Sequence, residues 1–227
     1  MAFIGCNDDD VVNYNLEVGA YFQGIYLNDT AVYAPVLIAE FNPKPVSLTA
    51  IDKNEDKYVL ESYWAGDYSY RWIPIETDYS KAPLEENTFK FTAIFEDTEQ
   101  NIEKNASISL STVPEPFKIT ETNYISERSE LIVSWENTNA DMFIVQISTN
   151  LTESPIFQSF NLIPDTEEIE ENTQLTTTIK KSTLKWFSAA QNGEVYIVSV
   201  HAFNLKNGDI NKITGEFIAT KNIVWGK

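Results

Sequence analysis

The chain of 227 residues contains one cysteine, Cys6, and one histidine, His201. A single cysteine cannot form an internal disulfide, so the fold must be held by its hydrophobic core. Zinc sites use several Cys or His ligands at close spacing, and one of each far apart matches no such pattern. A Ser-His-Asp or Cys-His catalytic group would have to be built on His201 alone. These scarcities argue against zinc binding and against nucleophilic catalysis.

Basic residues are also scarce, with 16 Lys and Arg against 34 Asp and Glu and a net charge of -18. Nucleic-acid binding requires clustered Lys and Arg, so we expect no nucleic-acid partner. The same charge argues against electrostatic docking on an anionic lipid surface. No apolar run approaches the ~20 residues that a membrane-spanning helix needs. Any membrane attachment is therefore expected to come from a covalent anchor.

Hydrophobic residues, in contrast, are plentiful, at 43% of the chain, and include 13 Phe, 11 Tyr and 5 Trp. This content is ample for packed cores and argues against a disordered chain. Aromatic residues are enriched in strands, so the composition favours β structure. The length fits one large domain or two domains of average size.

The start of the chain carries a short motif, Phe3-Ile4-Gly5-Cys6, followed by Asn7-Asp8-Asp9-Asp10. The motif resembles the lipobox of bacterial lipoproteins, although Leu is commonest where Phe3 stands. The acidic continuation resembles the signal that sends Bacteroidetes lipoproteins to the outer face of the outer membrane. The resemblance implies a lipid on Cys6, a surface-export signal at Asn7, Asp8, Asp9 and Asp10, and a disordered tether over residues 1–10. The alternative is a solvated tail with an incidental thiol.

Two further features near the N-terminus bear on export. Only five residues precede Cys6, whereas a secretory signal peptide has an apolar region of roughly 7–15 residues. We therefore expect either that the chain begins close to its mature end or that Cys6 is an ordinary thiol. Asp29-Thr30-Ala31 resembles the short sequence on which Bacteroidetes attach O-glycans, which would place a glycan on Thr30. A polar turn at Asn28-Asp29 is the alternative.

Residues 11–112 alternate between apolar and polar positions over short stretches separated by turn residues. This period of two predicts half-buried strands. Seven or eight such strands at this spacing are typical of a β-sandwich. We therefore predict an Ig-like antiparallel sandwich here, with all-β structure throughout the chain. Val113-Pro114-Glu115-Pro116 is predicted to be a linker, because two prolines prevent a strand ladder from continuing.

Residues 117–227 form the second predicted domain. Glu130–Trp135 and Met142–Ser148 resemble the early strands of fibronectin type III domains, with a buried Trp in the first. Glu194–Asn204 resembles a later strand of that family, with Tyr196 at the place of its corner tyrosine. Asn207-Gly208 is a strong hairpin signal. The resemblance implies a second antiparallel sandwich, and we predict one short helix in it at Lys180–Ala190.

Acidic clusters could in principle carry chemistry. The oxygen-rich stretches Asp52–Asp56 and Asp165–Glu171 could supply calcium ligands, but neither has the spacing of a calcium-binding loop. We therefore expect no cofactor, with calcium as the alternative. Glycoside hydrolysis would require two carboxylates roughly 5–10 Å apart in a cleft. Domains of this size are more typical of binding modules, so we do not expect an enzyme.

The stretch from Tyr63 to Trp72 is the most suggestive of binding. Strand alternation places Tyr68, Tyr70 and Trp72 on one face, where they are predicted to pack into a core. Tyr63, Trp64 and Arg71 are the predicted ligand-binding residues, because they are the better candidates for exposure.

These features together resemble the accessory lipoproteins of Bacteroidetes polysaccharide-uptake systems, which carry sandwich domains behind a lipid anchor. The resemblance implies a non-catalytic outer-membrane protein that binds extracellular glycan. The alternative is a scaffold that binds an outer-membrane protein partner. Glycan capture predicts an exposed aromatic platform, whereas a protein partner predicts an apolar patch or a free sheet edge.

Overall fold

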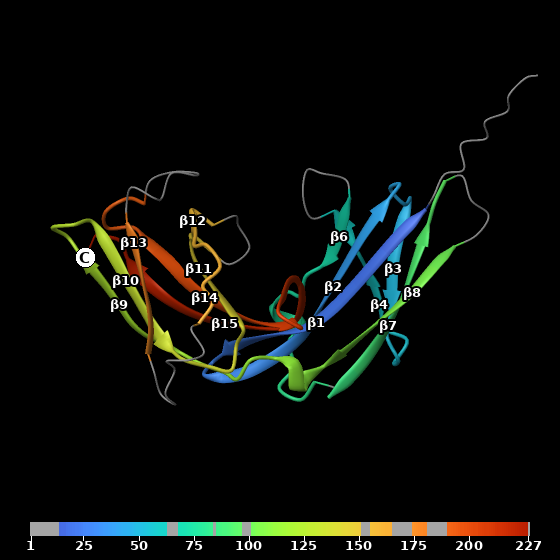
Figure 1. Cartoon of the computed structure of the whole chain (residues 1–227), viewed down its shortest axis with the longest axis horizontal. Helices are drawn as coiled ribbons and strands as arrows, with labels where there is room; N and C mark the ends of the chain where they lie inside the picture. Colours follow the sequence, from blue (N-terminus) through green and yellow to red (C-terminus); the bar gives the residue numbers. More distant parts are fainter. Residues whose placement is uncertain are drawn as a thin grey trace, which may run out of the picture. The chain divides into compact units, whose positions relative to one another are not determined.

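The computed structural model describes residues 14–62, 68–83, 85–96, 101–150, 155–164, 174–180 and 190–226. Within these ranges the chain forms fifteen strands and two short 3-10 turns, and no α-helix (Figure 1). The predicted all-β class is confirmed, and the sheets have a sandwich-like arrangement. None of the described segments is a helix of the length and apolarity that crossing a membrane requires.

The chain divides into two compact units that are not consecutive stretches of sequence. Unit 1 consists of Met1–Gly19, Leu37–Trp72 and Thr88–Ala106, and unit 2 consists of Ala20–Val36, Ile73–Asn87 and Ser107–Lys227. This division differs from the predicted domains 11–112 and 117–227. The reason is the long hairpin of β1 (Asn15–Leu27) and β2 (Thr30–Asn42), whose two open ends belong to unit 1 and whose turn belongs to unit 2.

Unit 1 is built from two layers of short strands. One layer holds the ends of β1 and β2 with β6 and β5, and the other has the order β4-β3-β7-β8. Aromatic rings join the layers, since the ring of Tyr58 on β4 lies 4.9 Å from the ring of Trp72 on β6. Within its own layer, Tyr58 lies 5.5 Å from the ring of Phe89 on β7. The bounds are β3 Ser47–Ile51, β4 Lys57–Val59, β5 Glu61–Ser62, β6 Ser69–Trp72, β7 Glu86–Ile94 and β8 Ile102–Ser109.

Unit 2 also has two layers. A three-stranded sheet has the order β13-β10-β9, and the other layer has the order β12-β11-β14-β15 followed by β1 and β2. The β1 residues Phe22–Ile25 pair in parallel with residues Gly215–Ile218 of β15. The bounds are β9 Ile119–Ile125, β10 Glu130–Glu136, β11 Met142–Ser148, β12 Phe157–Gln158, β13 Gln174–Lys180, β14 Val195–Lys206 and β15 Asp209–Val224.

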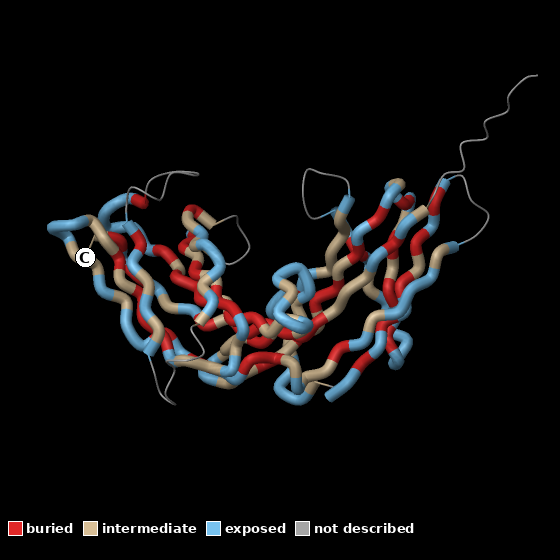
Figure 2. Tube along the Cα trace, in the orientation of Figure 1, coloured by how far each residue is buried: buried red, intermediate tan, exposed pale blue. Residues whose placement is uncertain are grey.

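The core of unit 2 consists of aromatic side chains from both layers. Phe117 lies 6.0 Å from Phe143 and 5.9 Å from Phe217, and Trp135 lies 5.7 Å from Phe143, measured between ring centroids. All four are at most 1% exposed. Buried positions recur along the strands of both units in Figure 2, as a half-buried sheet requires. Trp135 is thus a core residue, as the sequence predicts.

The two predicted tight turns are confirmed. Asn28 and Asp29 have φ of 49° and 60° between β1 and β2, and Asn207 and Gly208 have φ of 56° and 72° between β14 and β15. Positive φ at both central residues matches the strand twist in a two-residue hairpin, and Asn, Asp and Gly tolerate it best. These turns fix which residues of each hairpin face each other.

Two local predictions differ from the structure or lie outside it. Lys180 is the last residue of β13, so no helix begins there, and residues 181–189 lie outside the described ranges. The predicted linker is preceded by the 3-10 turn η2 (Leu110–Thr112). Val113 and Phe117, on either side of the two prolines, are 8% and 1% exposed. The two ends of this segment are therefore packed into unit 2, while Glu115 and Pro116 between them are exposed.

Candidate functional site

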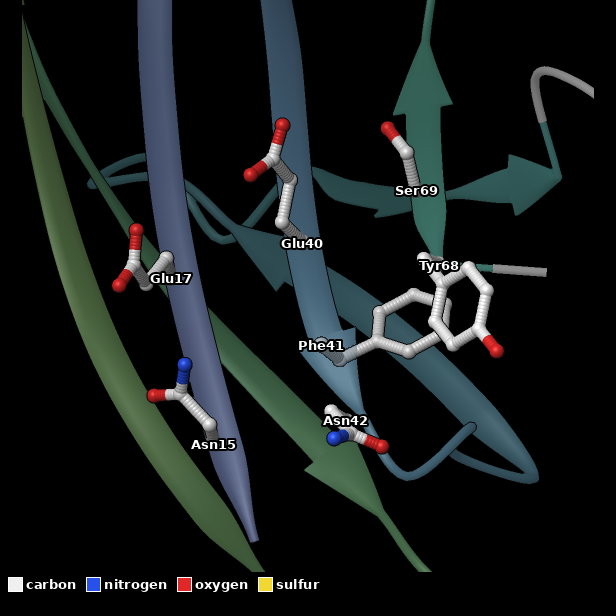
Figure 3. A pocket seen from close by; sticks show the side chains of 7 residues that line it. All are labelled: Asn15, Glu17, Glu40, Phe41, Asn42, Tyr68 and Ser69. Carbon is white, nitrogen blue, oxygen red and sulfur yellow. The ribbon is translucent and has the colours of Figure 1, made fainter. Parts of the chain in front are cut away.

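A groove with a cavity volume of about 400 Å³ lies in unit 1. It is open to solvent on one side of the sheet that contains the ends of β1 and β2 (Figure 3). Two acids, two amides, two aromatic residues and one hydroxyl line it: Asn15, Glu17, Glu40, Phe41, Asn42, Tyr68 and Ser69. Three neighbouring strands supply these side chains, so the sheet itself forms the floor.

Strand alternation places the polar groups of the groove. On β1, Leu16 is buried while its neighbours Asn15 and Glu17 are exposed. On β2, Phe41 is buried between exposed Glu40 and Asn42 (the pattern of a half-buried strand). Glu40 also faces Ser69 of β6 in the antiparallel register. The buried residues of each strand therefore anchor it, and the polar residues between them point outward.

Tyr68 provides the aromatic surface of the groove. It immediately precedes β6, and its backbone carbonyl accepts a hydrogen bond from Phe41 N–H at 3.1 Å. Its side chain is 67% exposed, so the predicted core position of Tyr68 is wrong. Tyr70 and Trp72, which are half-buried, do pack against other rings, at 4.8 Å from Phe41 and 4.9 Å from Tyr58. Tyr68 lies before the first residue of β6, so the strand alternation that turns Tyr70 and Trp72 toward other rings does not apply to it.

The polar groups of the groove have no partners in the part of the chain that the structure describes. There, the side chains of Glu17, Glu40, Asn15, Asn42 and Tyr68 make no hydrogen bond or ion pair. None of the described residues that line the groove is a Lys or an Arg. Carboxylates accept hydrogen bonds and amides both donate and accept them. The groove can therefore bind hydroxyl or ammonium groups of a ligand at several points.

None of the three predicted ligand-binding residues is among the described residues that line the groove. Tyr63 and Trp64 lie outside the described residues. Arg71 is half-buried on β6, where it faces Ile38 of β2 and Glu61 of β5, and it does not line the groove. Sequence reasoning missed Glu17 and Glu40. Alternation marks both as outward-facing, but only the pairing of β1 with β2 shows that they share one face.

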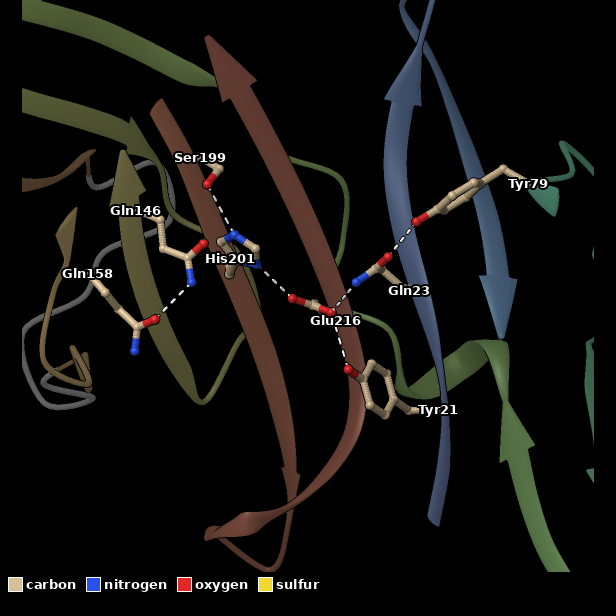
Figure 4. Close-up of polar contacts among 8 residues, drawn as sticks. All are labelled: Tyr21, Gln23, Tyr79, Gln146, Gln158, Ser199, His201 and Glu216. Carbon is tan, nitrogen blue, oxygen red and sulfur yellow. Dashed lines mark hydrogen bonds and ion pairs between the residues drawn. The ribbon is translucent and has the colours of Figure 1, made fainter. Parts of the chain in front are cut away.

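A second polar cluster lies on one face of a sheet in unit 2 (Figure 4). Nδ1 of His201 lies 2.7 Å from Oε1 of Glu216, and Nε2 of His201 lies 3.1 Å from Oγ of Ser199. Gln23 Nε2 donates to the other oxygen of Glu216 at 2.5 Å, and Tyr79 donates its hydroxyl proton to Gln23 Oε1. Burial raises the pKa of Tyr79, as does the negative charge of Glu216.

The order Ser199, His201, Glu216 has the connectivity of a Ser-His-acid catalytic group, but its burial does not suit catalysis. Ser199 is 1% exposed and Glu216 is 4% exposed. A nucleophile must be within reach of a substrate carbonyl, and a hydroxyl enclosed to this degree is not. The cluster instead satisfies a buried carboxylate with donors from β14 and β1, which is a structural role for His201.

The two acidic stretches that are the alternative for calcium lie only partly within the described residues. Oδ1 of Asp52 accepts hydrogen bonds from the N–H groups of Asn54 and Asp56, at 2.8 and 3.0 Å. This carboxylate therefore stabilises its own turn. Residues 165–171 lie outside the described ranges. Across the described ranges, no group of three or more His, Cys, Asp or Glu side chains is placed to hold a metal ion.

The predicted modification sites are placed only in part. Cys6 and residues 7–10 lie outside the described ranges. Thr30 is the first residue of β2, directly after the Asn28-Asp29 turn, and it is half-buried. A turn between two strands is a position that a modifying enzyme can approach.

Comparisons with known proteins place the chain in no family. No protein-family model matches it, and no curated protein matches it. One similar solved structure is described as "Structural insight into host cell surface retention of a 1.5-MDa bacterial ice-binding adhesin", with 12% sequence identity and a TM-score of 0.29. The alignment covers 93% of this chain and 64% of that one, so this chain spans less than two thirds of its length. At this TM-score the similarity carries no argument.

Proposed function

We propose that this protein is a non-catalytic lipoprotein that binds extracellular glycan through the groove of unit 1. The observation that carries the proposal is the 67% exposed ring of Tyr68 beside side chains that have no partner in the described residues, including Glu17 and Glu40. Sugars present apolar faces that pack on aromatic rings, and hydroxyl groups that bond acids and amides. A concave site with a few converging polar groups is the usual form of a small-ligand site.

We also propose that unit 2 contains a fibronectin III-like domain and unit 1 an Ig-like one. The strand orders β13-β10-β9 and β12-β11-β14-β15 support the assignment of unit 2, because they divide seven antiparallel strands between two sheets. Tyr196 supports it as well: its hydroxyl accepts a hydrogen bond from Gln191 N–H, five residues earlier, at 3.0 Å. This is the contact that a corner tyrosine makes.

The proposed location is the outer face of a bacterial outer membrane, with lipid on Cys6, export directed by Asn7–Asp10 and a glycan on Thr30. The resemblance of Phe3–Cys6 to a lipobox supports the anchor, and the charge of -18 leaves electrostatic membrane binding unsupported. The test is to express the chain behind a complete lipoprotein signal and to feed a labelled fatty acid. We expect label and membrane fractionation for the parent chain and neither for Cys6→Ser. Equal labelling of both would contradict the anchor.

A glycan array with the purified chain, followed by calorimetry on the glycan bound best, tests the binding function. We expect Tyr68→Ala to weaken binding about tenfold, because removing an aromatic ring that stacks on a nucleobase costs on the order of 1–3 kcal/mol, and we take a similar cost for a sugar face on Tyr68. Phe160→Ala is the matched control, since Phe160 is 92% exposed and lies in unit 2. Unchanged affinity in Tyr68→Ala, or an equal loss in Phe160→Ala, would contradict the assignment to this groove.

Binding to an outer-membrane protein is the second candidate. Phe160 and Ile163 of unit 2 favour it, because they are 92% and 69% exposed and only three residues apart. Exposed apolar side chains that are close together mark interaction surfaces. Capture of one partner from outer-membrane extract by the parent chain, and its loss with Phe160→Ala but not with Tyr68→Ala, would favour this candidate over glycan binding.

A further inference from the structure

We infer that the groove of unit 1 selects saccharides that carry a protonated amine over neutral and acidic saccharides. This inference rests on the proposed glycan-binding function and specifies its ligand class. It comes from the charges that line the groove, from their placement on neighbouring strands and from their lack of partners.

Glu17 and Glu40 supply the charge. They lie on the neighbouring strands β1 and β2, and Figure 3 shows both side chains on the face that the groove occupies. Both are exposed, and in the described part of the chain neither carboxylate accepts a hydrogen bond or forms an ion pair. Among the lining residues that the structure describes, no basic side chain balances them.

Like charges on neighbouring strands repel each other and destabilise the pair. An ammonium group placed between them removes this repulsion and adds charge-assisted hydrogen bonds, which are roughly twice as strong as neutral ones. It has three N–H donors and no acceptor. Glu17 and Glu40 accept only, and the side-chain oxygens of Asn15 and Asn42 beside them can also accept. The acceptors of the groove therefore match an amine better than they match a hydroxyl.

Acidic saccharides meet the opposite situation. A carboxylate or sulfate in the groove would face Glu17 and Glu40, and the described lining residues offer it no Lys or Arg as a partner. The net charge of -18 adds long-range repulsion of polyanions and attraction of cations. Discrimination between ligands requires such a repulsive element as well as an attractive one. Tyr68 can stack on any sugar, so it gives binding without selecting charge.

The test compares three disaccharides by calorimetry on the full chain near neutral pH, with a chelator present to exclude divalent cations. The first is the N-acetylglucosamine disaccharide, the second is the same disaccharide without its acetyl groups, and the third is a galacturonate disaccharide. The first two differ only in acetylation, so the difference between their affinities measures the effect of the free amine. We expect the amine form to bind about tenfold more tightly than the acetylated form, a factor that corresponds to about 1.4 kcal/mol. We expect this preference to shrink as salt is added.

Three variants assign the preference to the groove. Glu17→Gln and Glu40→Gln keep the side-chain shape and remove the charge, so each should weaken binding of the amine form more than binding of the acetylated form. Glu121→Gln removes the same charge from an exposed position on β9 in unit 2 and should leave the preference unchanged. Thermal unfolding of each variant checks that it is folded.

Each outcome decides between the two proposals. Equal binding of the acetylated and amine forms would overturn the inference and leave the glycan-binding function standing. A preference that survives Glu17→Gln and Glu40→Gln would also overturn it, because the amine would then bind elsewhere on the acidic surface. No binding of any disaccharide, together with an empty glycan array, would overturn the proposed function itself.

Discussion

Glu216 shows at the scale of one residue how a buried charge is accommodated. Glu216 is 4% exposed. Nδ1 of His201 lies 2.7 Å from Oε1 of its carboxylate, and Nε2 of Gln23 donates a hydrogen bond to Oε2 at 2.5 Å. A buried charge is costly unless it is paired and hydrogen-bonded. No local sequence pattern predicts this cluster, because Glu216 is 15 residues from His201 and 193 residues from Gln23.

Removing the carboxylate should therefore destabilise the protein. We expect Glu216→Ala to lower the free energy of unfolding by about 2–4 kcal/mol, because it leaves buried donors without an acceptor. Glu121→Ala, at an exposed position of β9, should change it by no more than about 0.5 kcal/mol. Urea unfolding of the three proteins measures the difference. Equal midpoints for the two variants would show that the cluster contributes nothing.

The raised pKa of Tyr79 predicts how the free energy of unfolding changes at alkaline pH. Burial, followed by the negative charges of Glu216 and Asp78, raises the pKa of Tyr79 above its ordinary value of 10.0. The unfolded chain therefore loses this proton at a lower pH than the folded protein does, so the contribution of Tyr79 is complete below about pH 10 and is lost as the pH rises further.

Urea midpoints measured from about pH 8 to about pH 11 test this expectation. The midpoint should fall above about pH 10, and the fall should be smaller in Tyr79→Phe. Burial also raises the pKa of Tyr26 and Tyr33, so part of the fall should remain in this variant. A Tyr79→Phe profile parallel to that of the parent chain would show that the Tyr79 proton is not linked to folding.

At the scale of one element, β15 is shaped by a close backbone contact. A Cβ atom at Gly215 would lie 2.2 Å from the carbonyl oxygen of Thr112 and 2.7 Å from the Cα atom of Val113. The same turn is tied to β15 by a hydrogen bond from Thr112 Oγ1 to the Thr214 carbonyl at 2.6 Å. Glycine at this position therefore reflects the approach of η2 and the predicted linker to the strand.

Gly215→Ala should lower the free energy of unfolding by about 2 kcal/mol or more, because the contacting atoms are backbone and cannot move aside cheaply. Gly19→Ala is the matched control, since a Cβ atom at Gly19 of β1 would have no neighbour within 4 Å. It should leave stability unchanged or raise it slightly, as glycine weakens a strand. Thermal or urea unfolding distinguishes the two. A loss as large in Gly19→Ala would mean that backbone flexibility, rather than the close contact, sets the cost.

At the scale of the whole molecule, the parallel pairing of β1 with β15 decides what can fold alone. Residues Phe22–Ile25 cover one edge of β15. A fragment that begins at residue 113, at the predicted linker, keeps β15 but loses this partner. An unpaired edge strand is a template for aggregation.

We therefore expect the fragment 113–227 to be less stable than the full chain and to associate with itself. Sedimentation and urea unfolding of the fragment and the full chain provide the measurement. A monomeric fragment that unfolds at the same urea concentration as the full chain would show that β1 is dispensable and that the predicted boundary at 113–116 is an autonomous one.

Local sequence patterns by themselves determined the all-β class, the two hairpin turns with the strands that flank them, and the burial of Trp135. These features depend on neighbours in the chain: alternation fixes which side of a strand is buried, and Asn28-Asp29 and Asn207-Gly208 adopt the positive φ that a two-residue turn needs. Only the tertiary structure decided the rest. The groove requires β1, β2 and β6 side by side, and the Glu216 cluster requires a parallel strand pair. Both bring together residues whose distance along the chain leaves no local signal, because strand pairing over long separations is set by the packing of the whole core.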